Sequence, residues 1–372
     1  MRVMWLGTYE SAYPRTRVLV AGLRARGVDV VECHPPVWER REHKATGLGA
    51  AGIARAAAGY AAAWARLAGA ARRAPRPDVV VAGYPAQPDA LPAWLVARRL
   101  GARLVADCMI SLVDTLAGDR AVVRGPAAAA LAGADRLTVR LADLVLCDTD
   151  AHALFFHERF GVPWRKLVVA PVGAEPDVFP PAPAPAGPPH ALFYGKLSPL
   201  HGLETVLAAA RMPGVPPLRV VGDGQLRPWL AEELRRDPPP GVAWERWIPY
   251  RRLGAAVREA AVCLGVFGTS AKAARVVPNK VWQAMAAGRP VVTADTPGAR
   301  EAVEHGVSGL LVPAGDPPAL AAALRALAAD AELRARMGSA ARAAYLRRGA
   351  PAAAAAPLHE ALTTRFASLS GR

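Results

Sequence analysis

The sequence predicts an α/β protein with two Rossmann-like domains that face a central cleft, and three observations support this prediction. Apolar, strand-like runs alternate with helix-like segments along most of the 372 residues. The runs are nearly continuous in Val, Leu and Ile, which is typical of parallel strands covered by helices on both faces. The alternation stops once, at a proline-rich stretch, and then starts again.

Residues 1–179 form the predicted N-terminal domain. Strands are expected at 2–7, 28–33, 77–83, 102–108, 142–149 and 166–173, and helices around 15–26, 88–101 and 151–161. The alanine-rich segment 48–76 has apolar residues at helical spacing on one face and arginines on the other. We favour a helix packed on the first domain with a solvated arginine face. The alternative is a basic amphipathic surface that meets a membrane or a lipid-linked acceptor.

The stretch PPAPAPAGPP, residues 180–189, is the predicted linker, because six prolines in ten residues favour a semi-rigid extended chain. The alternation restarts in residues 190–345, the predicted C-terminal Rossmann-like domain. Its strands are expected at 190–195, 217–224, 242–248, 261–268, 289–295 and 309–312. Residues 346–372 form a predicted helical tail, and in two-domain folds of this type such a tail often crosses back to the first domain.

Composition narrows the class of partner and the compartment. The formal charge of +15 favours anionic partners such as nucleic acid, a phospholipid surface or a phosphorylated small molecule. There is no basic tail or aromatic-basic repeat, so we do not expect nucleic acid. The four cysteines form no C-x-x-C pair, which favours reduced thiols and no metal site. With no long apolar run, we expect a cytoplasmic protein, either soluble or peripheral on the inner face of the membrane.

Two loops of the second domain have the composition of a phosphate site. The loop GKLSPLHG, Gly195 to Gly202, combines two glycines with Lys196 and His201 beside a helix start, where anions bind readily. A solvated surface loop is the alternative. The second loop runs from Phe267 to Lys280. A lysine in the first turn of a helix is unfavourable against the helix dipole unless an anion lies there.

Other signals are weaker or absent. A Gly-Asp-Gly turn at 222–224 and the aromatic stretch 247–250 also follow predicted strands, and the aromatics fit a nucleobase or a packing role equally well. There is no Walker A sequence, no G-x-G-x-x-G and no G-x-S-x-G. Two Rossmann-like domains with a cationic cleft and no dinucleotide fingerprint therefore suggest a nucleotide-diphosphate sugar as ligand.

Five motifs of the chain can be compared with known families: PNKVWQAMAAGRPVV, GKLSPLHG, DTDAH, PVGAEPDVF and the opening GTYESAYPRTR. In these motifs the chain resembles the GT-B fold glycosyltransferases, specifically the retaining family-4-like group, also called glycosyl transferases group 1. The resemblance implies transfer of a sugar from a nucleotide-diphosphate sugar, with retention of the anomeric configuration. It implies that the donor binds the second domain. The first domain would bind the acceptor, which is a metabolite, a lipid-linked molecule or a polysaccharide.

Site residues follow from matching these motifs. The catalytic candidates are Lys196, Lys280 and Asp107. The donor-binding candidates are Gly195, His201, Gly202, Gly224, Thr269, Arg275, Asn279 and Gln283, and the acceptor-side candidates are Gly7, Thr8, Tyr9 and Arg15. No metal or other cofactor is expected, since side-chain cations would stabilise the leaving diphosphate.

Two departures from the family pattern leave alternatives open. Arg275 and Gln283 stand where many members have two glutamates, and Asp107 lies near the position of a common histidine. A non-catalytic subunit that binds sugar nucleotides is therefore one alternative. A nucleotide-sugar epimerase of the same architecture is the other.

Overall fold

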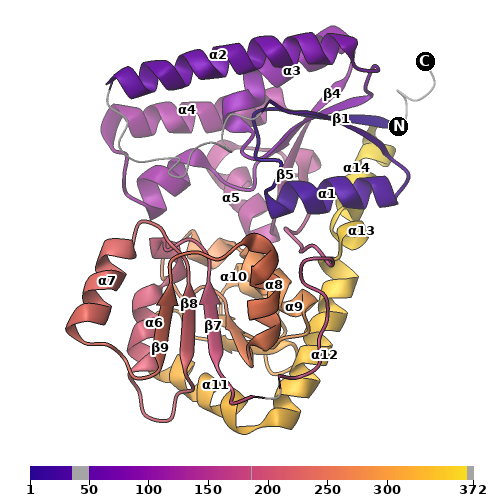
Figure 1. Ribbon diagram of the computed structural model, residues 1–372. Helices are drawn as coiled ribbons and strands as arrows, with labels where there is room; N and C mark the ends of the chain where they lie inside the picture. The colour runs from indigo at the N-terminus through magenta and orange to yellow at the C-terminus, as the bar shows by residue number, and fades with distance from the viewer. Residues whose placement is uncertain (36–49, 186, 367–372) are drawn as a thin grey trace.

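Two parallel sheets of six strands organise the chain (Figure 1). The computed structural model describes residues 1–35, 50–185 and 187–366. The last residues of the predicted tail, 367–372, lie outside these ranges. The α/β fold class with two Rossmann-like sheets is confirmed.

The first sheet has the strand order β2-β1-β3-β4-β5-β6, and every neighbouring pair is parallel. Its strands are β1 (Arg2–Leu6), β2 (Asp29–Cys33), β3 (Val79–Ala82), β4 (Arg103–Asp107), β5 (Leu144–Cys147) and β6 (Leu167–Val169). In β3 and β5 every residue is buried, as expected for strands that helices cover on both faces.

Alternate residues of these strands contact two different layers of helices. Met4, Leu6 and their neighbours pack against α2 (Ala50–Arg73), α3 (Ala90–Leu100), α4 (Gly125–Leu141) and α5 (Asp150–Phe160). Val3 and Trp5 face the opposite layer, formed by α1 (Pro14–Ala25) and the C-terminal helix α14 (Ala356–Phe366). The sequence analysis assigned no helix to 125–141, where the structure has α4.

The second sheet has the order β12-β11-β10-β7-β8-β9 and is also parallel throughout. Its strands are β7 (Ala191–Tyr194), β8 (Leu218–Val221), β9 (Val242–Glu245), β10 (Val262–Leu264), β11 (Val291–Ala294) and β12 (Gly309–Val312). The helices of this half are α6 (Leu203–Ala210), α7 (Arg227–Arg236), α8 (Tyr250–Glu259), α9 (Asn279–Ala286), α10 (Pro297–Arg300), α11 (Pro317–Ala329) and α12 (Ala331–Arg348).

The C-terminal helices connect the two halves. In Figure 1 the yellow helix α12 runs along the second half, and α13 (Pro351–Ala354) and α14 continue beside α1 of the first. The Tyr345 hydroxyl donates to the Ala174 carbonyl at 2.9 Å, and the Ala174 amide donates to Gly349 at 3.2 Å. Because α14 supplies buried Leu358 and Leu362 to the first core, this core is completed by residues from the far end of the chain.

Two surface features bear on the expected membrane contact. None of the helices within the described ranges has the length and the apolar composition needed to cross a bilayer. In Figure 1 the helix α2 lies along the outer side of the first half, away from the second. The arginines of α2 that the structure describes, such as Arg66 and Arg72, are exposed, while Leu67 is buried in the core. The structure thus has the packed helix with a solvated arginine face.

The closest approach between the tail and the first half occurs at Gly22 of α1. A Cβ atom there would lie 2.0 Å from the Pro351 carbonyl oxygen. We expect Gly22→Ala to lower the free energy of unfolding by about 1–3 kcal/mol, because neither backbone can move freely.

Gly133 in α4 is exposed and has open space around it. Gly133→Ala is the matched control and should stabilise by about 0.5–1 kcal/mol. Chemical denaturation of both variants measures the difference; equal stabilities would contradict this packing.

Candidate functional site

Three loops at the carboxyl ends of β7, β8 and β10 pack backbone against backbone. Gly202 has a left-handed φ of 62°, and a Cβ there would lie 2.5 Å from the Gly268 amide nitrogen. Gly222 and Gly224 approach the backbone of the first loop as closely, with added Cβ atoms 2.0 Å from Gly195 O and 2.7 Å from Leu197 O. The glycines of the sequence motifs therefore allow three loops to share one site.

His201 in the first loop and Lys280 in helix α9 are both buried, and both side chains contact the ring of Phe193. The Lys280 ammonium nitrogen is 3.8 Å from the centroid of the Phe193 ring, and it has no hydrogen-bond partner among the residues that the structure describes. Burial holds the pKa of Lys280 well below its usual range. A buried amine without a hydrogen-bond partner, at 4% exposure, is energetically costly.

The surroundings of His201 disfavour the charged form of its ring. Burial, followed by the charge of Lys280, keeps the pKa of His201 well below its usual value. Its Nδ1 pairs with the carbonyl of Lys196, and its ring meets the edge of Phe193. Sequence alone does not report this desolvation of the His201 imidazole.

The remaining donor-side candidates differ in how far their side chains are exposed. Lys196 and Thr269 are exposed beside the three loops. Asn279 begins helix α9, where Pro278 is the N-cap residue, and the Asn279 side chain lies near Tyr13 of the first half. Gln283 is buried, and its amide donates to the Tyr250 hydroxyl at 3.3 Å.

The Gln283 contact belongs to a network that joins the two halves. The Tyr250 hydroxyl donates to Glu175 at 2.6 Å, and the same carboxyl group forms an ion pair with Arg17 at 2.8 Å. Gln283 is therefore already occupied by protein partners.

Arg275 reaches across the cleft to the first half. Its guanidinium donates to Asp114 at 2.8 Å and lies 4.3 Å from the centroid of the Phe155 ring, while its carbonyl accepts from the Thr149 hydroxyl at 2.6 Å. Lys272 makes a similar contact, with its amine 2.6 Å from the Thr115 hydroxyl. Burial lowers the pKa of Lys272 to about 8.

Asp107 and Arg15 form a buried pair with each other. The Arg15 Nε lies 2.9 and 3.0 Å from the two oxygens of Asp107, and neither side chain has exposed surface. The guanidinium also donates to the carbonyls of Ala170 and Cys147. This pair ties α1 to the ends of three strands. It leaves neither residue open to a substrate, so the structure gives no support to the catalytic role of Asp107 or to the acceptor role of Arg15.

The other acceptor-side candidates surround the buried carboxyl group of Asp89. The Thr8 amide and hydroxyl donate to Asp89, and the Trp64 indole nitrogen donates to it at 3.0 Å. Gly7 has a φ of 141°, and a Cβ there would lie 2.6 Å from the Asp89 carboxylate. Burial raises the pKa of Asp89 to about 6 despite these donors. Tyr9 is fully buried and stacks on His34.

The structure reveals cleft residues that the sequence analysis did not include among its site residues. Asp114 and Asp119 lie on the helical turn that follows β4, and Tyr13 lies on the loop that follows β1. The sequence offered one signal for these residues: the position of Asp114 shortly after a predicted strand. Nothing in the sequence indicated that Lys272 would face this turn.

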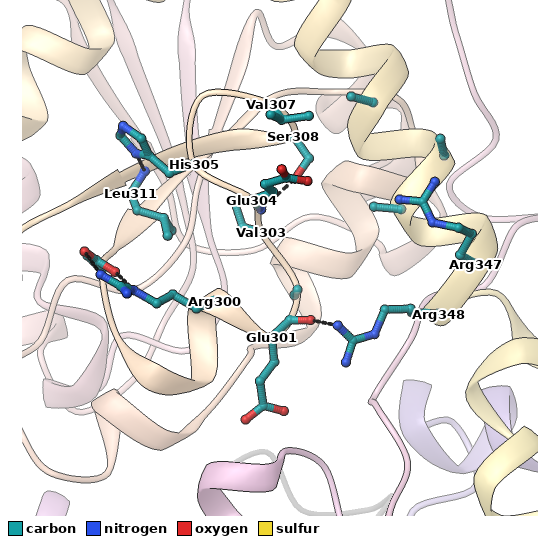
Figure 2. Close-up of a pocket in the computed structure, with 15 residues that line it drawn as sticks. Arg300, Glu301, Val303, Glu304, His305, Val307, Ser308, Leu311, Arg347 and Arg348 are labelled. Atoms are coloured by element: carbon teal, nitrogen blue, oxygen red, sulfur yellow. Dashed lines mark hydrogen bonds and ion pairs between the residues drawn. The ribbon is translucent and has the colours of Figure 1, made fainter.

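A separate pocket of about 820 Å³ lies between the segment 295–311 and helix α12 (Figure 2). Arg300 is paired there with Asp295 at 2.5 Å, and Arg348 donates to the Glu301 carbonyl. The carboxylate of Glu301 points away from Glu304 and Ser308 in Figure 2 and accepts from two amides at the start of α5. None of the predicted site residues lines this pocket.

Solved structures with the same arrangement are known. Sucrose-phosphate synthase from Thermosynechococcus elongatus superposes with a TM-score of 0.76 at 17% identity, covering 99% of both chains. HepE from Anabaena, solved in complex with UDP-glucose, superposes with a TM-score of 0.69 at 18% identity, covering 98% of this chain and 100% of HepE. At these identities the likeness establishes the fold.

Sequence relatives are more informative about the family. D-inositol 3-phosphate glycosyltransferases from Nocardiopsis dassonvillei and Geodermatophilus obscurus are 30% and 31% identical over 243 and 228 residues, which are 57% and 55% of this chain. The matches cover 54% and 47% of those relatives, so the chain spans about half the length of the curated relatives it matches.

Two family models match successive parts of the chain. The one described as glycosyl transferase 4-like domain matches residues 12–173, and the one described as glycosyl transferases group 1 matches residues 188–330. Each match covers one of the two sheets, and the solved relatives have the same pair of sheets. The chain belongs to the group 1 glycosyltransferases of GT-B fold.

Proposed function

We propose that the protein transfers a sugar from a nucleotide-diphosphate donor to a hydroxyl-bearing acceptor, with retention of the anomeric configuration. The observation that most supports this proposal is the buried Lys280 amine, which has no partner within the described residues. It lies beside neutral His201 and among three glycine loops at strand ends. A diphosphate in these loops would supply the missing negative charge.

The electrostatics favour an anion over a neutral ligand. Lys280, Lys272 and Arg120 each lower the pKa of His201 through their positive charges, after the larger effect of burial. An anion bound among these groups is stabilised more strongly than in water, because the surroundings have a low dielectric constant. The start of helix α9 adds amide donors that are directed at the same region.

In the proposed reaction, negative charge develops beside basic side chains. The bond between the anomeric carbon and the diphosphate oxygen breaks, and the oxygen gains negative charge that Lys280, Lys196 and His201 stabilise. The acceptor hydroxyl forms the new bond from the same face of the sugar. Its proton passes to the leaving phosphate oxygen, so the step needs no dedicated protein base.

The known relatives support the substrate classes. HepE was solved with UDP-glucose, and the curated relatives are named for D-inositol 3-phosphate. We therefore propose a uridine-diphosphate sugar as the first donor to test and a polyol or its phosphate as the first acceptor. The test is turnover: nucleoside diphosphate released only when acceptor is present supports transfer. Release without acceptor supports hydrolysis or epimerase-like chemistry, and no release with tight binding supports a binding subunit.

Lys280→Met tests the phosphate role directly. Methionine keeps the apolar contact with Phe193 and removes a buried amine that has no hydrogen-bond partner among the described residues, so we expect a higher melting temperature. Loss of a charged hydrogen bond to phosphate should lower the affinity for a nucleoside diphosphate by about tenfold or more. Lys166→Met is the control, since Lys166 donates to the Ala142 carbonyl in the first half. Calorimetry that finds unchanged affinity in Lys280→Met would refute the role.

Binding of a nucleoside diphosphate should take up protons at pH 8. The pKa values of His201 and Lys280 lie below their usual ranges in the free protein, and a bound anion raises both. Protonated forms therefore become more populated on binding, and the affinity should increase as the pH falls. Titrations in two buffers with different ionisation enthalpies measure the uptake. Proton release, or no linked protons in wild type, would count against the arrangement.

A further inference from the structure

The cleft contains a second group of polar residues, formed by both halves of the molecule. The helical turn Asp114–Asp119 follows β4 of the first sheet and meets the loop that follows β10 of the second. Arg275 donates to Asp114 Oδ1 at 2.8 Å, and the Ser270 hydroxyl donates to Asp119 Oδ1 at 3.2 Å. Lys272 reaches Thr115 between them.

Each of these acids uses only one carboxylate oxygen. Asp114 Oδ2 and Asp119 Oδ2 are buried and have no hydrogen-bond partner in the described part of the chain, and the same is true of Arg275 Nε. The side chains of Asp114 and Arg275 are 15% and 17% exposed, so bulk water compensates little of this loss. Burying such groups without partners costs roughly 1–3 kcal/mol each, more when they are charged.

An arginine and a carboxylate can pair through two atoms on each side. The surface pair of Arg300 with Asp295 uses two nitrogens and two oxygens, at 2.5 and 2.8 Å. Arg275 and Asp114 use one of each, although the ring of Phe155 already holds the guanidinium in place. One donor, Arg275 Nε, and one acceptor, Asp114 Oδ2, therefore remain without hydrogen-bond partners at this contact within the described residues.

Adjacent hydroxyl groups of a sugar fit this pair. A hydroxyl both donates and accepts, so one can donate to Asp114 Oδ2 while its neighbour accepts from Arg275 Nε. Hydrogen bonds to charged partners are stronger than neutral ones. The loop that carries Arg275 also leads into Pro278 and Lys280, where the diphosphate is proposed to bind.

We propose that Asp114, oriented by Arg275 and assisted by Asp119, recognises the hydroxyl groups of a sugar or polyol in the cleft. The inference rests on the proposed function, because it places this group next to the diphosphate site. Since Asp114 comes from the first sheet and Arg275 from the second, the subsite is complete only when the two halves meet. Recognition of the sugar is thereby linked to closure of the cleft.

Asp114→Asn is the central variant, because asparagine keeps the shape and one oxygen while removing the charge. Asp119→Asn is the second variant, in case the first does not fold. Glu301→Gln is the matched control: its carboxylate also crosses between the halves, accepting from the amides of Asp150 and Ala151, but it lies outside the group. Calorimetry with UDP and with a panel of UDP-sugars, followed by acceptor titrations, compares all four proteins.

We expect Asp114→Asn to weaken binding of the preferred UDP-sugar about tenfold while binding of UDP stays unchanged. If donor binding is unchanged but KM for the acceptor rises about tenfold, the hydroxyls belong to the acceptor, and the recognition role still holds. Equal loss of UDP and UDP-sugar affinity, as a closure contact would produce, overturns it. So does no change in any constant. Failure of wild type to bind UDP or any other nucleoside diphosphate refutes the proposed function itself.

Discussion

Contacts between loops at the carboxyl ends of two parallel sheets determine how this protein is arranged. The loop after β10 meets residues that follow β4 and β5, through Arg275 with Asp114 and with the Thr149 hydroxyl. In a parallel sheet all the carboxyl ends lie on one edge, so two facing edges bring many loops together. Each sheet by itself provides half of a site. Their contact therefore creates the cleft, and the residues of both edges become neighbours there.

The C-terminal helices hold the two halves together by packing on both of them. Helix α12 packs on the second half, and α13 and α14 return to the first, where Leu358 and Leu362 fill the core beside α1. The first core is thus completed only when the whole described chain has folded. The chain between α12 and α13 includes Gly349, and α13 approaches α1 closely at Gly22. The two halves are therefore linked at a second place, apart from the loops at the strand ends.

Some buried ionisable groups have partners within the protein and others do not. Arg15 and Asp107 satisfy each other without exposed surface, and they hold three strand ends together. Lys280, Asp114 Oδ2 and Asp119 Oδ2 are buried without a hydrogen-bond partner in the same described residues. Stability alone favours pairs of the first kind, since unpaired buried charge is costly. These unpaired groups are the basis of the proposed diphosphate and sugar sites.

The sequence by itself determined the class of fold and identified the loops in which the diphosphate is proposed to bind. Hydrophobic runs predict which segments become buried parallel strands, and Gly202 and Gly224 have positive φ angles that other residues rarely adopt. Three properties were decided only by the tertiary structure: the neutral state of His201, the pairing of Asp107 with Arg15, and the position of Asp114 opposite Arg275. Burial and the distance between residues far apart in the chain set pKa values and ion pairs. Neither quantity is contained in a local pattern, so the sequence predicted the fold and the candidate loops, and folding decided which groups in them are paired.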